Sequence, residues 1–163
     1  MSMKKRMRCL VIVFVVVVLL AAVAVFYFVR RNSGGGDPVA YSTEAVNWDG
    51  ELSDEDVNPG YIALPGYDTI PLAAGSDKAE IALANPDGNT CWFQFQLVLQ
   101  DTEEVLYTSD LVAPGKAILN QTLSKSFDEG DYPLIVRINT FSEDGKTSYN
   151  GSDIVASLHV FKA

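Results

Sequence analysis

One uncharged run constrains the architecture of this chain more than any other feature. Residues 9–29 read CLVIVFVVVVLLAAVAVFYFV, 21 residues without a charged side chain. As a helix rising about 1.5 Å per residue, the run would extend about 32 Å, enough to cross a hydrocarbon core about 30 Å thick. A bilayer forces the backbone to satisfy its own hydrogen bonds, which favours a helix even for a β-branched run. We therefore predict one transmembrane helix over residues 9–29.

The charges that flank the run predict its orientation. Four basic residues precede it and two follow it: Lys4, Lys5, Arg6, Arg8, Arg30 and Arg31. Cytoplasmic flanks carry the excess of Lys and Arg, so we expect residues 1–8 to form a cytoplasmic tail and the C-terminal part to lie outside the cell. A cleaved signal peptide is the alternative, because Ala22-Val23-Ala24 fits a small-x-small cleavage site. The uninterrupted run followed by Arg30-Arg31 favours a retained anchor.

Residues 30–59 have the composition of a flexible acidic linker. The stretch begins with NSGGGDP, and residues 37–56 contain acidic residues but no basic one. Low apolar content with uncompensated charge is typical of extended chain. Tyr41 and Trp48 could dock on the domain that follows, but extended chain is the expectation. Asp54-x-Asp56-x-Asn58 resembles the start of a calcium loop, yet Pro59 and Pro65 occupy the positions that require Gly and Glu, so no metal site is expected.

The part of the chain after Arg31 is strongly acidic. It contains six basic and 21 acidic residues, a net charge of −15, whereas the first 31 residues carry +6. Phosphate contacts need Lys and Arg, so this composition argues against nucleic acid as a partner.

Residues 60–163 carry the pattern of a β-domain. Short alternating apolar segments are separated by turn residues, and none has a helical stripe. We predict about eight strands, at residues 61–64, 69–72, 78–84, 91–100, 105–109, 117–123, 132–141 and 154–160. This spacing predicts an antiparallel, Ig-like β-sandwich. Pro71 suits an edge strand, and Gly130-Asp131-Tyr132 could form the tyrosine corner that such sandwiches contain.

The stretch NPDGNTCWFQFQLVLQ, residues 85–100, contains the candidate site. Its alternation places Cys91, Phe93 and the apolar residues after them on one face, and Trp92, Gln94 and Gln96 on the other. The first face predicts a buried, unreactive cysteine. An aromatic ring beside amide groups can stack a sugar or accept a peptide, although a neighbouring segment could equally cover it. Trp92, Gln94 and Gln96 are therefore the candidate ligand face.

Nothing in the sequence indicates catalysis or a cofactor. His159 is the sole histidine, and neither a zinc-ligand pattern nor a nucleophile motif accompanies it. The two cysteines, Cys9 and Cys91, lie in the predicted span and in the predicted core, so no disulfide is expected. We predict a non-enzymatic protein.

Several short motifs give the domain a resemblance to a known group of proteins. They are Leu64-Pro65-Gly66-Tyr67, Asn85-Pro86, Asn89, Cys91, Phe93, Pro114-Gly115-Lys116-Ala117, Tyr132 and Asn150-Gly151. In this order they resemble small membrane-anchored proteins of Gram-positive bacteria (firmicutes and related actinobacteria), which join an N-terminal anchor, a variable polar linker and a C-terminal β-sandwich. The stretch QDTEEVLYTS departs from the group, whose members often have a tighter Asp-Gly hairpin. The resemblance implies a bacterial surface location and supplies no activity.

These observations favour a membrane-anchored module that binds or assembles with an envelope protein or wall glycan. The alternative is an accessory subunit of a membrane transport or conjugation complex, in which the transmembrane helix itself would be the interface.

Overall fold

The computed structural model describes residues 40–50 and 61–162. Every regular element in these two ranges is a β-strand. They contain no helix of the length and hydropathy needed to cross a membrane. The predicted span at residues 9–29 lies outside the described residues, as do Asp54, Asp56 and Asn58.

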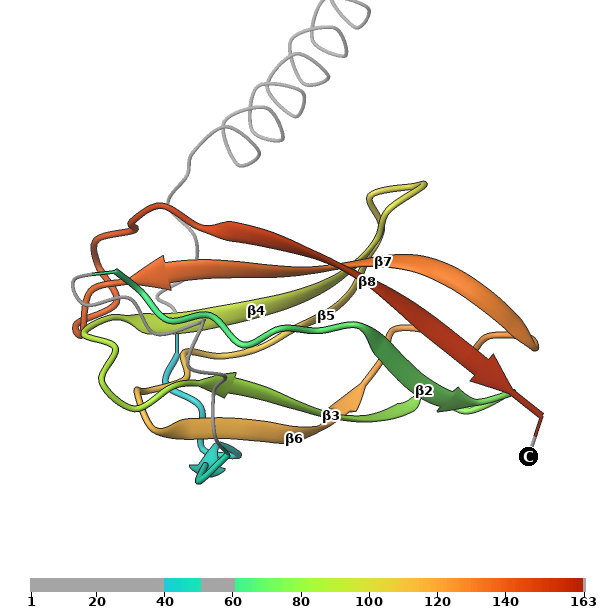
Figure 1. Cartoon of the computed structure of the whole chain (residues 1–163), viewed down its shortest axis with the longest axis horizontal. Coiled ribbons are helices and arrows are strands. Elements are labelled where there is room, and N and C mark those ends of the chain that lie inside the picture. Colours follow the sequence, from blue (N-terminus) through green and yellow to red (C-terminus); the bar gives the residue numbers. More distant parts are fainter. Residues whose placement is uncertain (1–39, 51–60, 163) are drawn as a thin grey trace, which may run out of the picture. The chain divides into compact units, whose positions relative to one another are not determined.

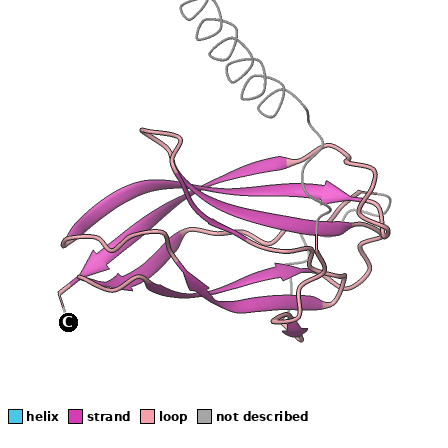
Figure 2. Cartoon of the chain, turned by 180° about the vertical axis from the view of Figure 1, so that it is seen from behind, coloured by secondary structure: helices cyan, strands magenta, loops and turns pink. Residues whose placement is uncertain are grey.

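Eight strands form two sheets. In chain order they are β1 (Val46–Asn47), β2 (Thr69–Ala73), β3 (Lys78–Asn85), β4 (Trp92–Leu99), β5 (Val105–Thr108), β6 (Lys116–Thr122), β7 (Gly130–Phe141) and β8 (Ser152–Phe161). One sheet has the order β1-β6-β3, and the other has the order β2-β8-β7-β4-β5. Figure 1 shows β3 and β6 in a layer below β4, β7 and β8, and Figure 2 shows the same two layers from behind. This arrangement is consistent with the predicted β-sandwich.

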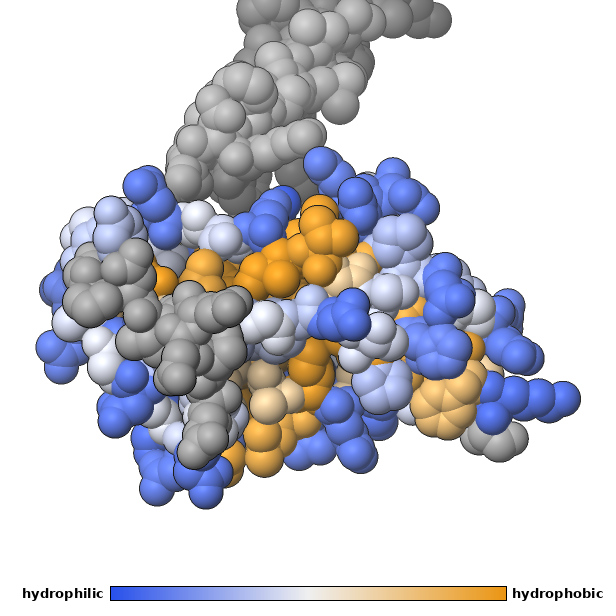
Figure 3. Space-filling view, in the orientation of Figure 1, coloured by the Kyte–Doolittle hydropathy of each residue, from blue (hydrophilic) through white to orange (hydrophobic). Residues whose placement is uncertain are grey.

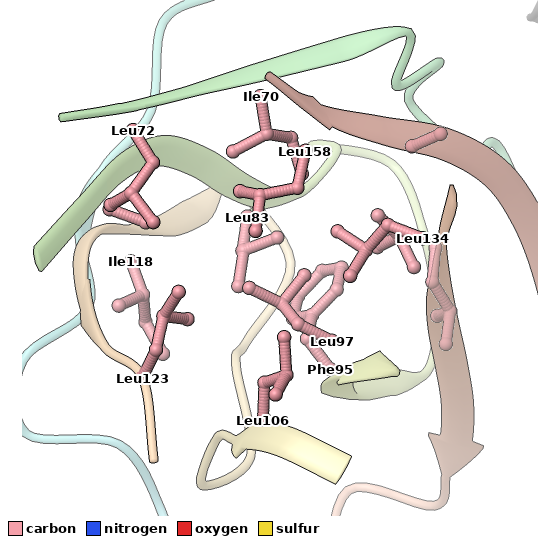
Figure 4. Close-up of a cluster of buried hydrophobic side chains, with 14 of the residues drawn as sticks. Ile70, Leu72, Leu83, Phe95, Leu97, Leu106, Ile118, Leu123, Leu134 and Leu158 are labelled. Atoms are coloured by element: carbon pink, nitrogen blue, oxygen red, sulfur yellow. The ribbon is translucent and has the colours of Figure 1, made fainter. Parts of the chain in front are cut away.

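A single apolar core joins the two sheets. Leu83 and Ile118 from the smaller sheet lie in one buried cluster with Phe95, Leu97 and Leu134 from the larger sheet (Figure 4). Alternation in β4, β7 and β8 sends every second side chain into this cluster, as the sequence predicts. Burial of one large apolar side chain contributes roughly 1.5–3 kcal/mol, so a core of this kind can hold the fold without a disulfide.

The prediction of a wholly antiparallel sandwich is wrong at one pair of strands. β2 runs parallel to β8, in register from Thr69 opposite Ser157 to Ala73 opposite Phe161. After β2 the chain turns and continues as β3 in the other sheet, so the neighbour of β2 is the last strand of the domain. Alternation indicates which face a residue occupies but not which way its partner runs. β2 does lie at a sheet edge, as Pro71 predicts.

The predicted strand at residues 61–64 is also wrong. This segment is irregular, and the side chain of Asn89 holds it in place of a strand partner. Asn89 Oδ1 accepts a hydrogen bond from the Ala63 amide at 2.9 Å, and Asn89 Nδ2 donates one to the Ala63 carbonyl at 2.9 Å. The Asn89 amide thus takes the place of a neighbouring strand for residue 63. Such a contact produces no alternation of apolar and polar residues in the sequence, so the contact could not be predicted from it.

Part of the expected linker pairs with the domain. β1 runs antiparallel to β6, with Val46 opposite Ala117. Upstream of it, the Ser42 amide donates to the Leu111 carbonyl, and the Leu111 amide donates to the Ala40 carbonyl. We call residues 40–48 the strap. The remainder of residues 30–59 lies outside the described part, apart from Asp49 and Gly50, and for that remainder the linker stays a prediction.

Side-chain hydrogen bonds to the backbone fix the first residues of β4 and β7, the two strands that carry the candidate site. Asn85 is fully buried, and its Nδ2 donates to the carbonyls of Cys91 and Val112, both at 2.9 Å, which anchors the start of β4. At the start of β7, the Tyr132 hydroxyl donates to the Asp128 carbonyl at 3.1 Å. This bond to the backbone a few residues upstream confirms the predicted tyrosine corner.

Candidate ligand face on the five-stranded sheet

Trp92, Gln94 and Gln96 share the outer face of β4. All three side chains are half-buried, whereas the intervening Phe93 and Phe95 are buried in the core. β4 lies between β7 and β5, so the three residues are away from the edges of their sheet. The structure thus places them on one surface, as the alternation predicts, and their binding of a ligand stays a prediction.

The register between β4 and β7 places a second set of side chains beside them. Phe141 lies opposite Trp92, Asn139 opposite Gln94, and Arg137 opposite Gln96. The alternation of residues 132–141 puts these three on the outward face. Nothing in the local sequence indicates that they meet β4 at this register, so they were not predicted as site residues.

The middle of this face offers unused amide groups. The side-chain amides of Gln94 and Asn139 form no hydrogen bond with another described residue, whereas Gln96 Nε2 donates to Thr108 Oγ1 at 3.5 Å. Each amide can both donate and accept. A ligand lying across β4 and β7 would therefore find a pair of free donors and acceptors next to an aromatic pair.

The charges on the face cancel. Arg137 donates to both carboxylate oxygens of Asp153, from Nε and from an Nη group, each at 2.9 Å. This hydrogen bonding raises the pKa of Arg137 and lowers the pKa of Asp153, so both remain ionised and paired near neutral pH. Gln94, Gln96 and Asn139 carry no charge. On a domain this acidic, the side chains of the β4–β7 face therefore carry no unpaired charge, although Glu103 is near enough to raise the pKa of Arg137 further.

A row of β-branched side chains follows directly after the Gln96 row. Val98 pairs with Val105 on one side and with Ile135 on the other, and Ile135 pairs with Val155. Val155 is 69% exposed and Val105 is 42% exposed. Figure 3 shows apolar side chains gathered over the middle of β8. The polar face therefore borders an apolar row that is exposed at its two ends, while Val98 within it is buried.

The strap covers the Trp92 end of the face. The ring of Tyr41 packs edge-on against Trp92, with 4.9 Å between centroids and 67° between the ring planes. The Tyr41 hydroxyl donates to the Glu143 carbonyl at 2.8 Å, which fixes the ring. A neighbouring segment therefore covers Trp92, whereas the side chains of Gln94 and Asn139 form no hydrogen bond within the described part of the chain, and ligand binding at this face stays a prediction.

The other candidate residues sit where the sequence places them. Cys91 is buried without a disulfide partner, and burial raises the pKa of its thiol, which disfavours the reactive thiolate. His159 is exposed on β8, with its Nδ1 2.6 Å from an Asp131 carboxylate oxygen. Within residues 40–50 and 61–162, no group of three His, Cys, Asp or Glu side chains is arranged to hold a metal ion.

Comparison of the chain with protein-family models, curated proteins and solved structures finds no match.

Proposed function

We propose that this chain is a single-pass membrane protein whose acidic C-terminal domain lies outside the cell and acts as a binding or assembly module. Its partner is another envelope protein or wall glycan, and no catalysis is involved. The anchor over residues 9–29 and the excess of basic residues before it support the membrane location and the orientation. The resemblance to anchored proteins of Gram-positive bacteria supports a bacterial cell surface.

The observation that carries the proposal is the neutral face on an acidic domain. Charged residues are depleted and aromatic residues enriched in the buried centres of protein interfaces. The β4–β7 face has this composition, with Trp92 and Phe141 in one row and, in the next, the amides of Gln94 and Asn139, which bond to no other described side chain or backbone group. The same combination suits a sugar, because the ring supplies a stacking surface and the amides bind hydroxyl groups.

We further propose that the domain is Ig-like. The order β8-β7-β4-β5 matches the G-F-C-C′ order of a variable-type Ig sheet, and β3 with β6 corresponds to the B–E pair of the other sheet. The tyrosine corner at Tyr132 supports the same assignment. Under this assignment, the proposed ligand face lies on the G-F-C-C′ sheet.

Site-directed photocrosslinking tests the proposed face. A photoreactive amino acid replaces Gln94 in the full-length chain in intact cells, and the matched control carries it at the exposed Glu80 on β3. We expect a specific adduct from position 94 and none from position 80. Adding Trp92→Ala should lower the yield several-fold, and digestion with a glycan hydrolase separates a glycan adduct from a protein adduct. Equal adducts at both positions, or a yield indifferent to Trp92→Ala, would contradict the proposal.

A further inference from the structure

Strand β6 is paired along only part of one of its edges. On one side it pairs with β3 from Lys116 to Thr122, with an irregularity opposite Glu80–Leu83. On the other side β1 pairs with only two residues, Lys116 and Ala117. Residues 118–122 therefore have no strand partner on that side within the described residues.

The strap leaves β6 where this open edge begins. Continued antiparallel pairing would place Ala45 and Glu44 opposite Ile118 and Leu119, but the pairing ends at Val46. The chain upstream instead bonds to Leu111 through Ser42. The strap thus occupies one end of the β6 edge and diverges from the rest.

A groove lies beside the open edge. Its volume is about 540 Å³, and it is lined by Glu44, Val46, Tyr107, Ile118, Leu119, Asn120 and Thr122. Ligand sites are typically about 300–1,000 Å³ in volume. Leu119 is 44% exposed and Val46 is 47% exposed, so apolar side chains are open to solvent within it. An added strand would therefore find backbone to pair with and a groove for its side chains.

The open edge lacks the usual protection against strand addition. Exposed edges are commonly guarded by charged side chains, proline or a covering segment. Residues 118–122 read ILNQT and contain neither a charge nor a proline. A strand of five residues is about 17 Å long, which is enough for main-chain recognition of an extended peptide.

The charge of the groove selects among possible occupants. Glu44 lies in the groove wall, and Glu44 and Asp110 add to the effect of burial in raising the pKa of the Tyr107 hydroxyl. The potential is therefore negative at the end of the groove near Tyr107 and Glu44, whereas Lys78 Nζ donates to Thr122 Oγ1 at 2.7 Å at the other end. A second copy of the domain would bring its own Glu44 into the same region, and this like-charge contact disfavours self-pairing.

We propose that the edge of β6 at residues 118–122, which no other described strand pairs on the β1 side, accepts an extended segment of another protein, one that carries alternate apolar side chains and a Lys or Arg facing Glu44. The segment pairs with residues 118–122 of β6, on the same side of β6 as β1 and in line with it. Its apolar side chains pack against Leu119, Val46 and Tyr107. This surface is separate from the Trp92 face, so the inference does not depend on the function proposed for that face.

Peptide selection tests the proposal directly. A phage-displayed library of ten-residue peptides is selected against the full-length chain in detergent micelles. We expect the enriched sequences to alternate apolar and polar residues and to contain Lys or Arg. A synthetic peptide of the enriched sequence should slow amide hydrogen exchange at residues 118–122.

Three variants locate the binding site. Glu44→Lys and Leu119→Lys should each weaken binding of the selected peptide at least tenfold, whereas Val155→Lys, an exposed aliphatic residue on the other sheet, should leave it unchanged. Unchanged melting temperatures show that the variants fold. The proposal is overturned if no peptide enriches, if protection appears elsewhere, or if the variants bind normally. It is equally overturned if exchange at residues 118–122 slows with protein concentration alone, because a second copy would then be the occupant.

Discussion

Asn85 shows how one buried polar side chain can hold several segments of this domain together. Its Nδ2 bonds to the carbonyls of Cys91 and Val112, and its Oδ1 accepts a hydrogen bond from Asn89 at 2.8 Å. Asn89 in turn holds Ala63. Several segments of the domain therefore meet at two amide side chains whose buried polar atoms are all satisfied. The sequence motif NPDGN therefore forms a turn and also, through Asn85 and Asn89, holds these segments together.

Replacing Asn85 with a residue of similar size should be costly. Asn85→Leu leaves the Cys91 carbonyl without a partner in a buried site, and an unpaired buried group costs about 1–3 kcal/mol. The Val112 carbonyl and Asn89 Nδ2 each lose one hydrogen bond but keep another, to the Phe93 amide and the Ala63 carbonyl, and each lost bond costs about 0.5–1.5 kcal/mol. We expect the free energy of unfolding to fall by about 2–4 kcal/mol in urea denaturation. Asn139→Leu is the control, since that amide forms no bond with a described residue. Asn139→Leu should change the free energy of unfolding by less than about 0.5 kcal/mol. Similar losses in both variants would contradict the claim that the hydrogen bonds of Asn85 hold these segments together.

The burial of one cysteine thiol and two tyrosine hydroxyls predicts that the domain loses stability at alkaline pH. Burial raises the pKa of Cys91 above its ordinary value of 9.0, and burial raises those of Tyr67 and Tyr107 above 10.0. The unfolded chain therefore releases these protons first, so the stability is fully present below about pH 9 and falls as the pH rises further. Urea midpoints from about pH 7 to 11 measure the decline. Tyr67→Phe should make it shallower, and a flat profile in the parent would contradict the assignment.

The strap is the element that most changes how the candidate face is understood. It pairs with β6 through β1, bonds to Leu111 through its backbone, and places Tyr41 on Trp92. One short segment thus shields the aromatic end of the face and lines the groove at the β6 edge. Since the strap precedes the rest of the domain in the chain, both surfaces adjoin the segment that leads toward the predicted anchor.

Removal of the Tyr41 ring should expose Trp92. The edge-on pair contributes about 0.5–1.5 kcal/mol beyond its burial, so Tyr41→Ala should lower stability by about that amount. In a Trp48→Phe background Trp92 is the sole tryptophan, and its emission should move to longer wavelength with stronger quenching by acrylamide. Tyr61→Ala, which removes an exposed ring elsewhere, should change neither property. An unchanged spectrum in Tyr41→Ala would show that the strap does not cover Trp92.

Strands with long alternation could be predicted from the sequence, and short or topology-dependent elements could not. β4, β7 and β8 each alternate over eight or more residues, and their inward positions follow from period two. β1 has two exposed residues, so its pairing depends on contact with β6 and leaves no pattern. Alternation along residues 78–84 places Ile81 on the inward face with Ala79 and Leu83, but a register shift lies between Glu80 and Leu83 and Ile81 is only partly buried. There the Gln121 side chain bonds to the Ile81 amide and carbonyl.

The same distinction applies to the candidate face. Trp92, Gln94 and Gln96 could be placed together because one strand contains them. Phe141, Asn139 and Arg137 join them through the register between β4 and β7, which depends on the packed core of the whole domain. Tyr41 joins them through the strap, which lies within residues 30–59, a stretch whose acidic composition predicts extended chain. Contacts between distant segments therefore complete a surface of which the sequence indicates one strand.

At the scale of the whole molecule, the acidic charge sets where association is favourable. The part after Arg31 carries −15, and like-charge repulsion opposes contact between acidic surfaces. The β4–β7 face escapes this repulsion because Arg137 and Asp153 neutralise each other. The groove beside β6 is negative at its Glu44 end and so suits a cationic segment. Two surfaces of different character on one anchored domain would fit an assembly role, in which neighbouring components are held together at the membrane.

The most direct test of the central claim is the rate at which a small, membrane-impermeant maleimide labels Gln94→Cys in intact cells and in the purified full-length chain. The native cysteines should interfere little, since Cys91 is buried and Cys9 lies in the predicted span. Glu80→Cys on β3 is the matched control. If a partner covers the β4–β7 face outside the cell, the thiol of Gln94→Cys should label several-fold more slowly in cells than in the purified chain, while the thiol of Glu80→Cys labels equally in both. Equal rates for Gln94→Cys would contradict the proposed face, and no labelling of either variant in cells would contradict the proposed orientation.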